Sequence, residues 1–148
     1  MNDIHQIELI TNSLLKEKEK YLFELEKINT SIKNKLSMID KMKSYQDDYL
    51  NNSNLMLSKS IPVLHKNINF FVKRINVVIS QAESEISSLG KMKISILESV
   101  EKINRKIDLM DVFAKKSKSA LKMQEEKREQ NTLDDLSSTI KQRESEYE

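Results

Sequence analysis

The sequence is poor in the residues that make turns. Its 148 residues include one glycine and one proline, whereas ordinary usage would supply roughly ten and seven. Tight turns rely on glycine for positive φ and on proline for a fixed φ. Sandwiches, barrels and doubly wound sheets need a turn about every twelve residues, so we exclude them as the fold.

Cysteine and tryptophan are absent, and long hydrophobic runs are missing. Without cysteine there is no disulfide and no thiolate chemistry, which suits a reducing compartment. No run approaches the roughly 18 apolar residues of a membrane span, and residues 1–5 lack the pattern of a signal peptide. A net charge of +2 implies no strong attraction to polyanions. We expect a cytoplasmic protein whose residues 1–148 form one elongated domain.

A heptad pattern runs through the first third of the chain. Ten of fourteen seam positions are apolar between residues 4 and 50, which predicts a first long coiled-coil helix. The seam consists of Ile4, Ile7, Thr11, Leu14, Lys18, Tyr21, Leu25, Ile28, Ile32, Lys35, Ile39, Met42, Gln46 and Tyr49. Its polar members, Lys18, Lys35 and Gln46, weaken packing locally and are expected to set the register of the pairing.

The pattern stops at an Asn- and Ser-rich stretch, residues 51–60, which we expect to connect two helices. Ser60 before Ile61 and Pro62 predicts the start of a second helix, because serine caps free N–H groups and proline is tolerated in a first turn. The second helix is expected to cover about residues 62–141. The fold class is therefore all-α, an antiparallel coiled-coil hairpin of two long helices.

The seam of the second helix is predicted from two apolar series. They are Leu64, Ile68, Phe71, Ile75, Val78 and Ala82, and then Ile96, Val100, Ile103, Ile107, Met110, Ala114 and Leu121. One row slips by a residue between them, and we expect a local unwinding near Gly90. Folding back about Ser58 places Ile4 near Val112, so residues after about Phe113 overhang without a partner inside the chain.

Chemistry-bearing groups are scarce. His5 and His65 have too few acidic neighbours for a metal site, and Gly90 alone makes no phosphate loop. We therefore expect no catalytic residue, no metal and no cofactor. One basic run could attract nucleic acid or anionic lipid, but acidic residues follow it closely and stacking aromatics are scarce, so we expect no nucleic-acid partner. That run is Lys115, Lys116, Lys118 and Lys122.

Apolar residues exceed what a two-stranded seam can bury. The second helix has one stripe of Phe71, Ile75, Val78 and Ala82, and another of Ile68, Val72, Ile79 and Ile86. The first helix has a stripe of Met38, Met42, Tyr45 and Tyr49, which are adaptable contact residues. Such a surplus fits a broad seam or self-association as well as a docking face for another protein.

Short motifs resemble the FliJ family of the flagellar type III export apparatus. Tyr45-Gln46-Asp47-Asp48-Tyr49 is similar to its Tyr-Gln-x-x-Tyr segment, and Leu133-Asp134-Asp135-Leu136 resembles its ending. A Phe-x-x-x-Ile-x-x-Val-Ile run also agrees, at Phe71, Ile75, Val78 and Ile79. The family often has histidine at the position of Ala82, and commonly Gln and Leu at those of Met38 and Met42.

The resemblance implies a non-enzymatic stalk that is cytoplasmic and peripheral at the inner membrane through the export apparatus. Its partners would be the hexameric export ATPase (FliI-type), the cytoplasmic domain of the export gate (FlhA-type) and export chaperones. The family's gate-binding positions match Phe71, Ile75, Val78 and Ala82, and its matching face on the first helix is Met38, Met42, Tyr45 and Tyr49. The alternatives are the injectisome counterpart and a purely structural, self-associating coiled coil.

Overall fold

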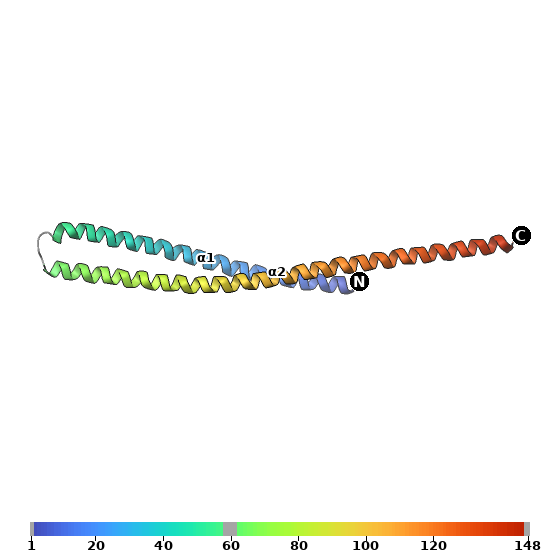
Figure 1. Cartoon of the computed structure of the whole chain (residues 1–148), viewed down its shortest axis with the longest axis horizontal. Helices are drawn as coiled ribbons and strands as arrows, with labels where there is room; N and C mark the ends of the chain where they lie inside the picture. The colour runs from blue at the N-terminus through green and yellow to red at the C-terminus, as the bar shows by residue number, and fades with distance from the viewer. Residues whose placement is uncertain (1, 58–61, 147–148) are drawn as a thin grey trace. The chain divides into compact units, whose positions relative to one another are not determined.

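Two long α-helices make up all of the chain that the structure describes. The computed structural model describes residues 2–57 and 62–146. Helix α1 is Asn2–Leu57 and helix α2 is Pro62–Glu146, and these ranges contain no strand (Figure 1). The predicted all-α class and the hairpin of two packed helices are confirmed. No helix in these two ranges is apolar over enough of its length to cross a bilayer.

The sequence predicted an end at the Asn- and Ser-rich stretch, but helix α1 does not end there. It continues through residues 51–57, because extending a helix that already exists is easy and asparagine and serine cost only a few tenths of a kcal/mol each. Residues 58–61, which include the predicted cap at Ser60, lie outside the described ranges. Helix α2 begins at Pro62 as predicted and runs to Glu146, past the expected end at residue 141.

The helices contribute to two compact units. Unit 2 is Glu19–Glu101, and unit 1 combines Met1–Lys18 with Lys102–Glu148. The prediction of a single domain over residues 1–148 stays a prediction.

The heptad frame of α1 is confirmed by burial. All fourteen predicted seam side chains, from Ile4 to Tyr49, are buried or half-buried. Between residues 3 and 52, only Ser31, Met38 and Leu50 join them, and every other side chain is exposed. The 3.5-residue repeat therefore correctly identified the side of α1 that packs on α2.

The predicted slip at Gly90 is wrong. Buried and half-buried side chains follow the heptad spacing of four and three without a break over residues 68–121. The series is Ile68, Val72, Ile75, Ile79, Ala82, Ile86, Leu89, Lys93, Ile96, Val100, Ile103, Ile107, Met110, Ala114, Ser117 and Leu121. Four further half-buried residues each lie directly beside a member of the series, namely Glu85, Gly90, Ser99 and Asn104. The row that enters the seam contains Val72 and Ile79, not Phe71 and Val78. Lys93, a polar member of that row, concealed its continuity in the sequence.

Polar and aromatic contacts fix the pairing of the helices in unit 2. Lys35 and Glu85 form an ion pair, Gln46 Nε2 donates to Asn76 Oδ1 at 2.8 Å, and the rings of Tyr49 and Phe71 lie 4.1 Å apart. Residue numbers rise on α1 as they fall on α2, so the helices are antiparallel, as Figure 1 shows. Two of the three polar seam residues thus have partners that specify register, as expected.

Unit 1 pairs the start of α1 with the middle of α2. Ile4, Ile7 and Thr11 line one groove together with Met110, Ala114 and other α2 residues. The last half-buried side chain on α2 is Leu121, eight residues beyond the predicted limit at Phe113.

The predicted C-terminal overhang is confirmed, although it is shorter. Every side chain of α2 from Lys122 to Glu146 is exposed. Within unit 1 these residues therefore have no helix of the described chain packed along them. Large apolar side chains are among them, namely Met123, Leu133, Leu136 and Ile140.

Candidate functional site

The core of unit 2 contains two residues that the sequence assigned to a docking face. Ile75 and Ala82 are only 7% and 2% exposed and form one buried cluster with Ile39 and Ile79. They belong to the seam row that faces α1, so their side chains contact the other helix of the same chain. They cannot contact a partner while the helices stay paired.

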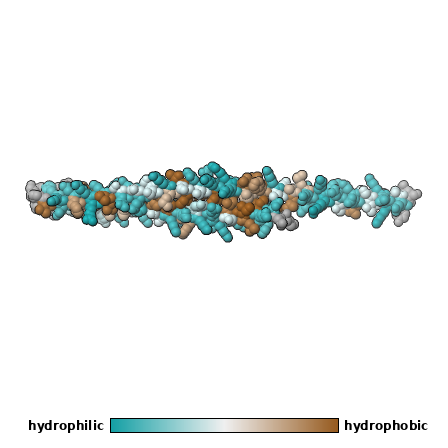
Figure 2. All heavy atoms as spheres, turned by 90° about the horizontal axis from the view of Figure 1, so that it is seen from below, coloured by the Kyte–Doolittle hydropathy of each residue, from teal (hydrophilic) through white to brown (hydrophobic). Residues whose placement is uncertain are grey.

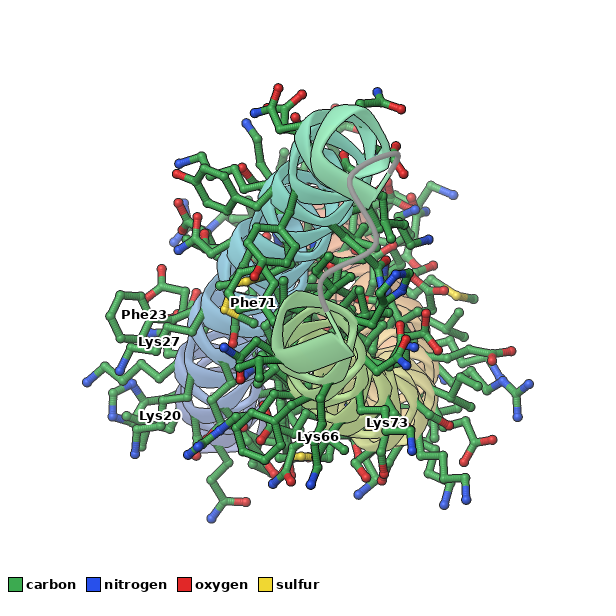
Figure 3. All side chains as sticks on the ribbon, turned by 90° about the vertical axis from the view of Figure 1, so that its left-hand side faces the viewer. Lys20, Phe23, Lys27, Lys66, Phe71 and Lys73 are labelled. Atoms are coloured by element: carbon green, nitrogen blue, oxygen red, sulfur yellow. The ribbon has the colours of Figure 1, made fainter. Side chains whose placement is uncertain are left out.

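Phe71 and Val78, the other two residues of the predicted docking face, are accessible at the surface. They are 38% and 41% exposed because they occupy the row that flanks the seam instead of entering it. The Phe71 ring packs against Tyr49 of α1 with an interplanar angle of 42°. Figure 3 shows Phe71 on the side of α2 that adjoins α1.

The predicted stripe on α1 is also divided by the fold. Met38 and Met42 are half-buried and pack against the core cluster of unit 2. Tyr45 is exposed, and Tyr49 is half-buried beneath Phe71. The structure therefore brings the two predicted stripes together through Tyr49 and Phe71, and each keeps an exposed part.

These residues form one surface, which we call the aromatic face. Its members are Met38, Tyr45, Tyr49, Phe71 and Val78. Tyr49 and Lys35 on the α1 seam contact Phe71 and Glu85 in the flanking row of α2, and Met38 and Tyr45 lie four residues before Met42 and Tyr49 on α1, next to this side of the seam. Aromatic side chains and methionine provide large, adaptable contact areas, which suits protein recognition.

The ion pair at Lys35 and Glu85 has an electrostatic consequence. The hydrogen bond from Lys35 and its positive charge hold the pKa of the Glu85 carboxyl below the ordinary value of 4.5, and a hydrogen bond from Gln81 acts in the same direction. The carboxylate form is therefore favoured, as expected beside a cation. The pair lies beside the core cluster and favours one register of the seam.

Ligand-binding chemistry is sparse in the described ranges. No three histidine, aspartate or glutamate side chains of residues 2–57 and 62–146 are grouped so that they could hold a metal ion. His5 and His65 are both exposed, in agreement with the predicted surface role. In the basic run of α2, Lys115 Nζ lies 3.1 Å from Asp111 Oδ2, so an acidic neighbour offsets one of its charges.

Sequence reasoning missed exposed apolar side chains on the outside of both helices. Phe23 lies on the outside of α1 with Lys27 Nζ 4.5 Å from its ring centroid (Figure 3). Val63, Phe70 and Val77 lie on the outside of α2. The spacing of Val63, Phe70 and Val77 could have identified them in the sequence, since they recur every seven residues outside the seam. It went unnoticed because the same stretch is apolar on other sides too.

The comparisons with known proteins agree with the family suggested by the motifs. The family model described as "Flagellar FliJ protein" matches residues 7–146. That match covers both helices and includes the overhang. No curated protein matches the chain, and no solved structure matches it.

Proposed function

The chain belongs to the FliJ family of flagellar proteins, and from that premise we propose that it couples the export ATPase to the export gate. The family is a component of flagellar protein export and is not an enzyme family. In the proposal, the chain promotes assembly of the hexameric FliI-type ATPase, binds the cytoplasmic domain of the FlhA-type gate and contacts export chaperones. It would then act in the cytoplasm, peripheral to the inner membrane.

The observation that carries the gate contact is the aromatic face. A large apolar ring at Phe71 stays 38% exposed although it packs on Tyr49, and Val78 is exposed one heptad further along α2. Exposed apolar surface that is held in a defined geometry favours a protein partner. Because Ile75 and Ala82 are buried, Phe71, Val78 and Tyr45 are the residues that we propose to contact the gate.

The test is a pull-down with the isolated cytoplasmic domain of the gate. Phe71→Ala with Val78→Ala should weaken binding at least about tenfold, since exposed aromatic anchors commonly contribute more than 1 kcal/mol each. Leu133→Ala is the matched control, because Leu133 is an exposed apolar residue far from the aromatic face in sequence. Undiminished binding by the double variant would reject the site. Ile75→Ala is unsuitable, because it removes core packing.

The proposed ATPase contact depends on unit 1. The exposed residues 122–146 and the start of α1 belong to this unit, and an unpaired helix with exposed leucines and isoleucine is suited to bind other chains. We propose that this end enters the ring of the export ATPase. Adding the chain separately to flagellar and injectisome ATPases would distinguish the two systems, since the cognate hexamer should assemble and accelerate.

A self-associating structural coiled coil is the competing function. It would bury the aromatic face against a second copy of the chain. Light scattering at several concentrations separates the two, because a stable homo-oligomer at micromolar concentration would favour self-association over gate binding.

A further inference from the structure

Helix α2 carries an exposed apolar row on the side opposite its seam. Val63, Phe70 and Val77 are 63–67% exposed and recur every seven residues; we call them the outer row. Phe70 lies two residues after the buried Ile68, and Val77 lies two residues after the buried Ile75. Because two residues turn an α-helix by about 200°, Phe70 and Val77 lie on the side opposite the seam. The outer row therefore points away from α1 and shares no residue with the aromatic face.

Positive charge accompanies this row without any negative charge. Residues 62–82 contain no aspartate or glutamate, and Lys66, Lys73 and Arg74 are all exposed. The lysines flank the row on one side and Arg74 flanks it on the other, with its Cζ 5.8 Å from the Phe70 ring centroid. Figure 3 shows Lys66 and Lys73 on the side of α2 away from α1.

This charge pattern narrows the choice of partner. A second copy docked on the outer row through a two-fold axis would bring these cations against the same cations, which is unfavourable. The occupant should therefore be anionic. It must also be apolar beneath its charged groups, because it has to accommodate a phenylalanine and two valines that are more than half exposed.

The shape of the surface favours a flat occupant. The outer row is the outermost line of the helix in unit 2, and its cations lie just beside it. A planar surface reaches that line and its flanks without touching the seam. From Val63 to Val77 the row spans about 21 Å at 1.5 Å per residue, so all three apolar side chains can contact one planar surface. Figure 2 views the molecule from below and shows apolar atoms interspersed with hydrophilic ones.

We propose that the outer row binds the surface of an anionic phospholipid membrane directly. Phe70, Val63 and Val77 enter the boundary between headgroups and acyl chains, while the cations of Lys66, Lys73 and Arg74 bind lipid phosphates. Interfacial helices combine an apolar stripe with flanking Lys and Arg in this way, and long basic side chains extend from the apolar layer to the headgroups. The contact requires neither the export gate nor the ATPase.

The first experiment measures co-sedimentation of the full chain with phosphatidylcholine vesicles, with and without phosphatidylglycerol. Binding should require phosphatidylglycerol and decline with salt. Lys66→Glu with Lys73→Glu should weaken binding more than about tenfold, because each cation near an anionic surface strengthens binding about fivefold. Phe70→Ser with Val77→Ser should weaken it about tenfold as well. Circular dichroism should show unchanged helicity for both, since all four side chains are exposed.

Two matched controls test whether position matters. Lys116→Glu with Lys122→Glu reverses two exposed lysines of unit 1, and Leu133→Ser with Ile140→Ser changes two exposed apolar residues there. Both controls should bind like the unchanged chain. Equal losses in test and control variants would overturn the proposal, as would equal binding to pure phosphatidylcholine. Capture of an acidic protein domain without any vesicle binding would also overturn it.

The absence of tryptophan offers a second readout. Phe70→Trp places one indole in the outer row, and its emission should shift to shorter wavelength on adding anionic vesicles. Leu133→Trp should show no shift. A Phe70→Trp emission that stays unchanged would exclude insertion. Because the gate pull-down contains no lipid, the lysine variants should keep full gate binding there. Membrane binding and the gate contact can therefore be rejected independently of each other.

Discussion

Lys35 and Gln46 are polar side chains in an otherwise apolar seam, and each has a partner on the other helix. Lys35 forms an ion pair with Glu85, and Gln46 donates to Asn76. Shifting the pairing by one heptad would separate both pairs and would place Val78 or Met92 opposite Lys35 instead of the Glu85 carboxylate. These contacts therefore favour one register among several that the heptad repeat alone would allow.

The Glu85 pair predicts a dependence of stability on pH. Because the folded state lowers the Glu85 pKa, this group stabilises the fold above about pH 4.5, its ordinary pKa. The contribution disappears as the pH falls through the lowered value. Glu85→Gln should therefore unfold at a lower urea concentration than the unchanged chain at pH 7, and at the same concentration at pH 2. Ser84→Ala, an exposed neighbour, is the control. An equal deficit at both pH values would contradict the assignment.

At the scale of the element, α2 shows how two adjacent apolar rows compete for one seam. Phe71 and Val78 follow the same seven-residue spacing as Val72 and Ile79, one position earlier. Both rows are compatible with a helix. The second row enters the seam because it continues through Ile86, Lys93 and Val100 to Leu121, whereas the first would require a slip at Gly90.

Gly90 therefore sits in an ordinary stretch of continuous helix. A methyl group built on its Cα meets no atom within 4 Å. Gly90→Ala should raise the free energy of unfolding by about 1 kcal/mol, the usual difference in helix propensity. Urea denaturation followed by circular dichroism measures it. Ser87→Gly, at an exposed position one turn earlier, should have the opposite sign. A loss of stability in Gly90→Ala would restore the idea of a local unwinding there.

At the scale of the whole molecule, the chain separates the residues that stabilise it from those that remain exposed. The buried core residues lie between Ile28 and Ile103, and residues 122–146 contribute no buried side chain. The tail thus adds exposed helix and apolar surface without adding to the core. That division fits the proposed contact of this end with the export ATPase.

Removing residues 122–146 should therefore leave the thermal midpoint of the remaining helices within about 2 °C, since no core contact is lost. The same truncation should abolish acceleration of the export ATPase, while binding to the gate domain persists. Thermal circular dichroism, ATP hydrolysis and the gate pull-down measure the three quantities. Full acceleration by the truncated chain would disprove the proposed contact of the tail with the ATPase.

The sequence by itself determined the helical hairpin, the seam of α1, the start of α2 and the existence of an overhang. Each depends on local propensity or on a repeat within one helix, which can be read without knowing the partner helix. The family could be recognised as well, since its motifs are short stretches of sequence.

Only the tertiary structure decided which apolar row of α2 is buried. Phe71 and Val72 are adjacent in sequence, differ by about 100° around the helix and are both apolar, so pairing with α1 chooses between them. That choice places Val72 and Ile79 in the seam, leaves Phe71 and Val78 at the surface, and directs the outer row away from α1. Burial is a property of two helices in register, and no single stretch of sequence contains it.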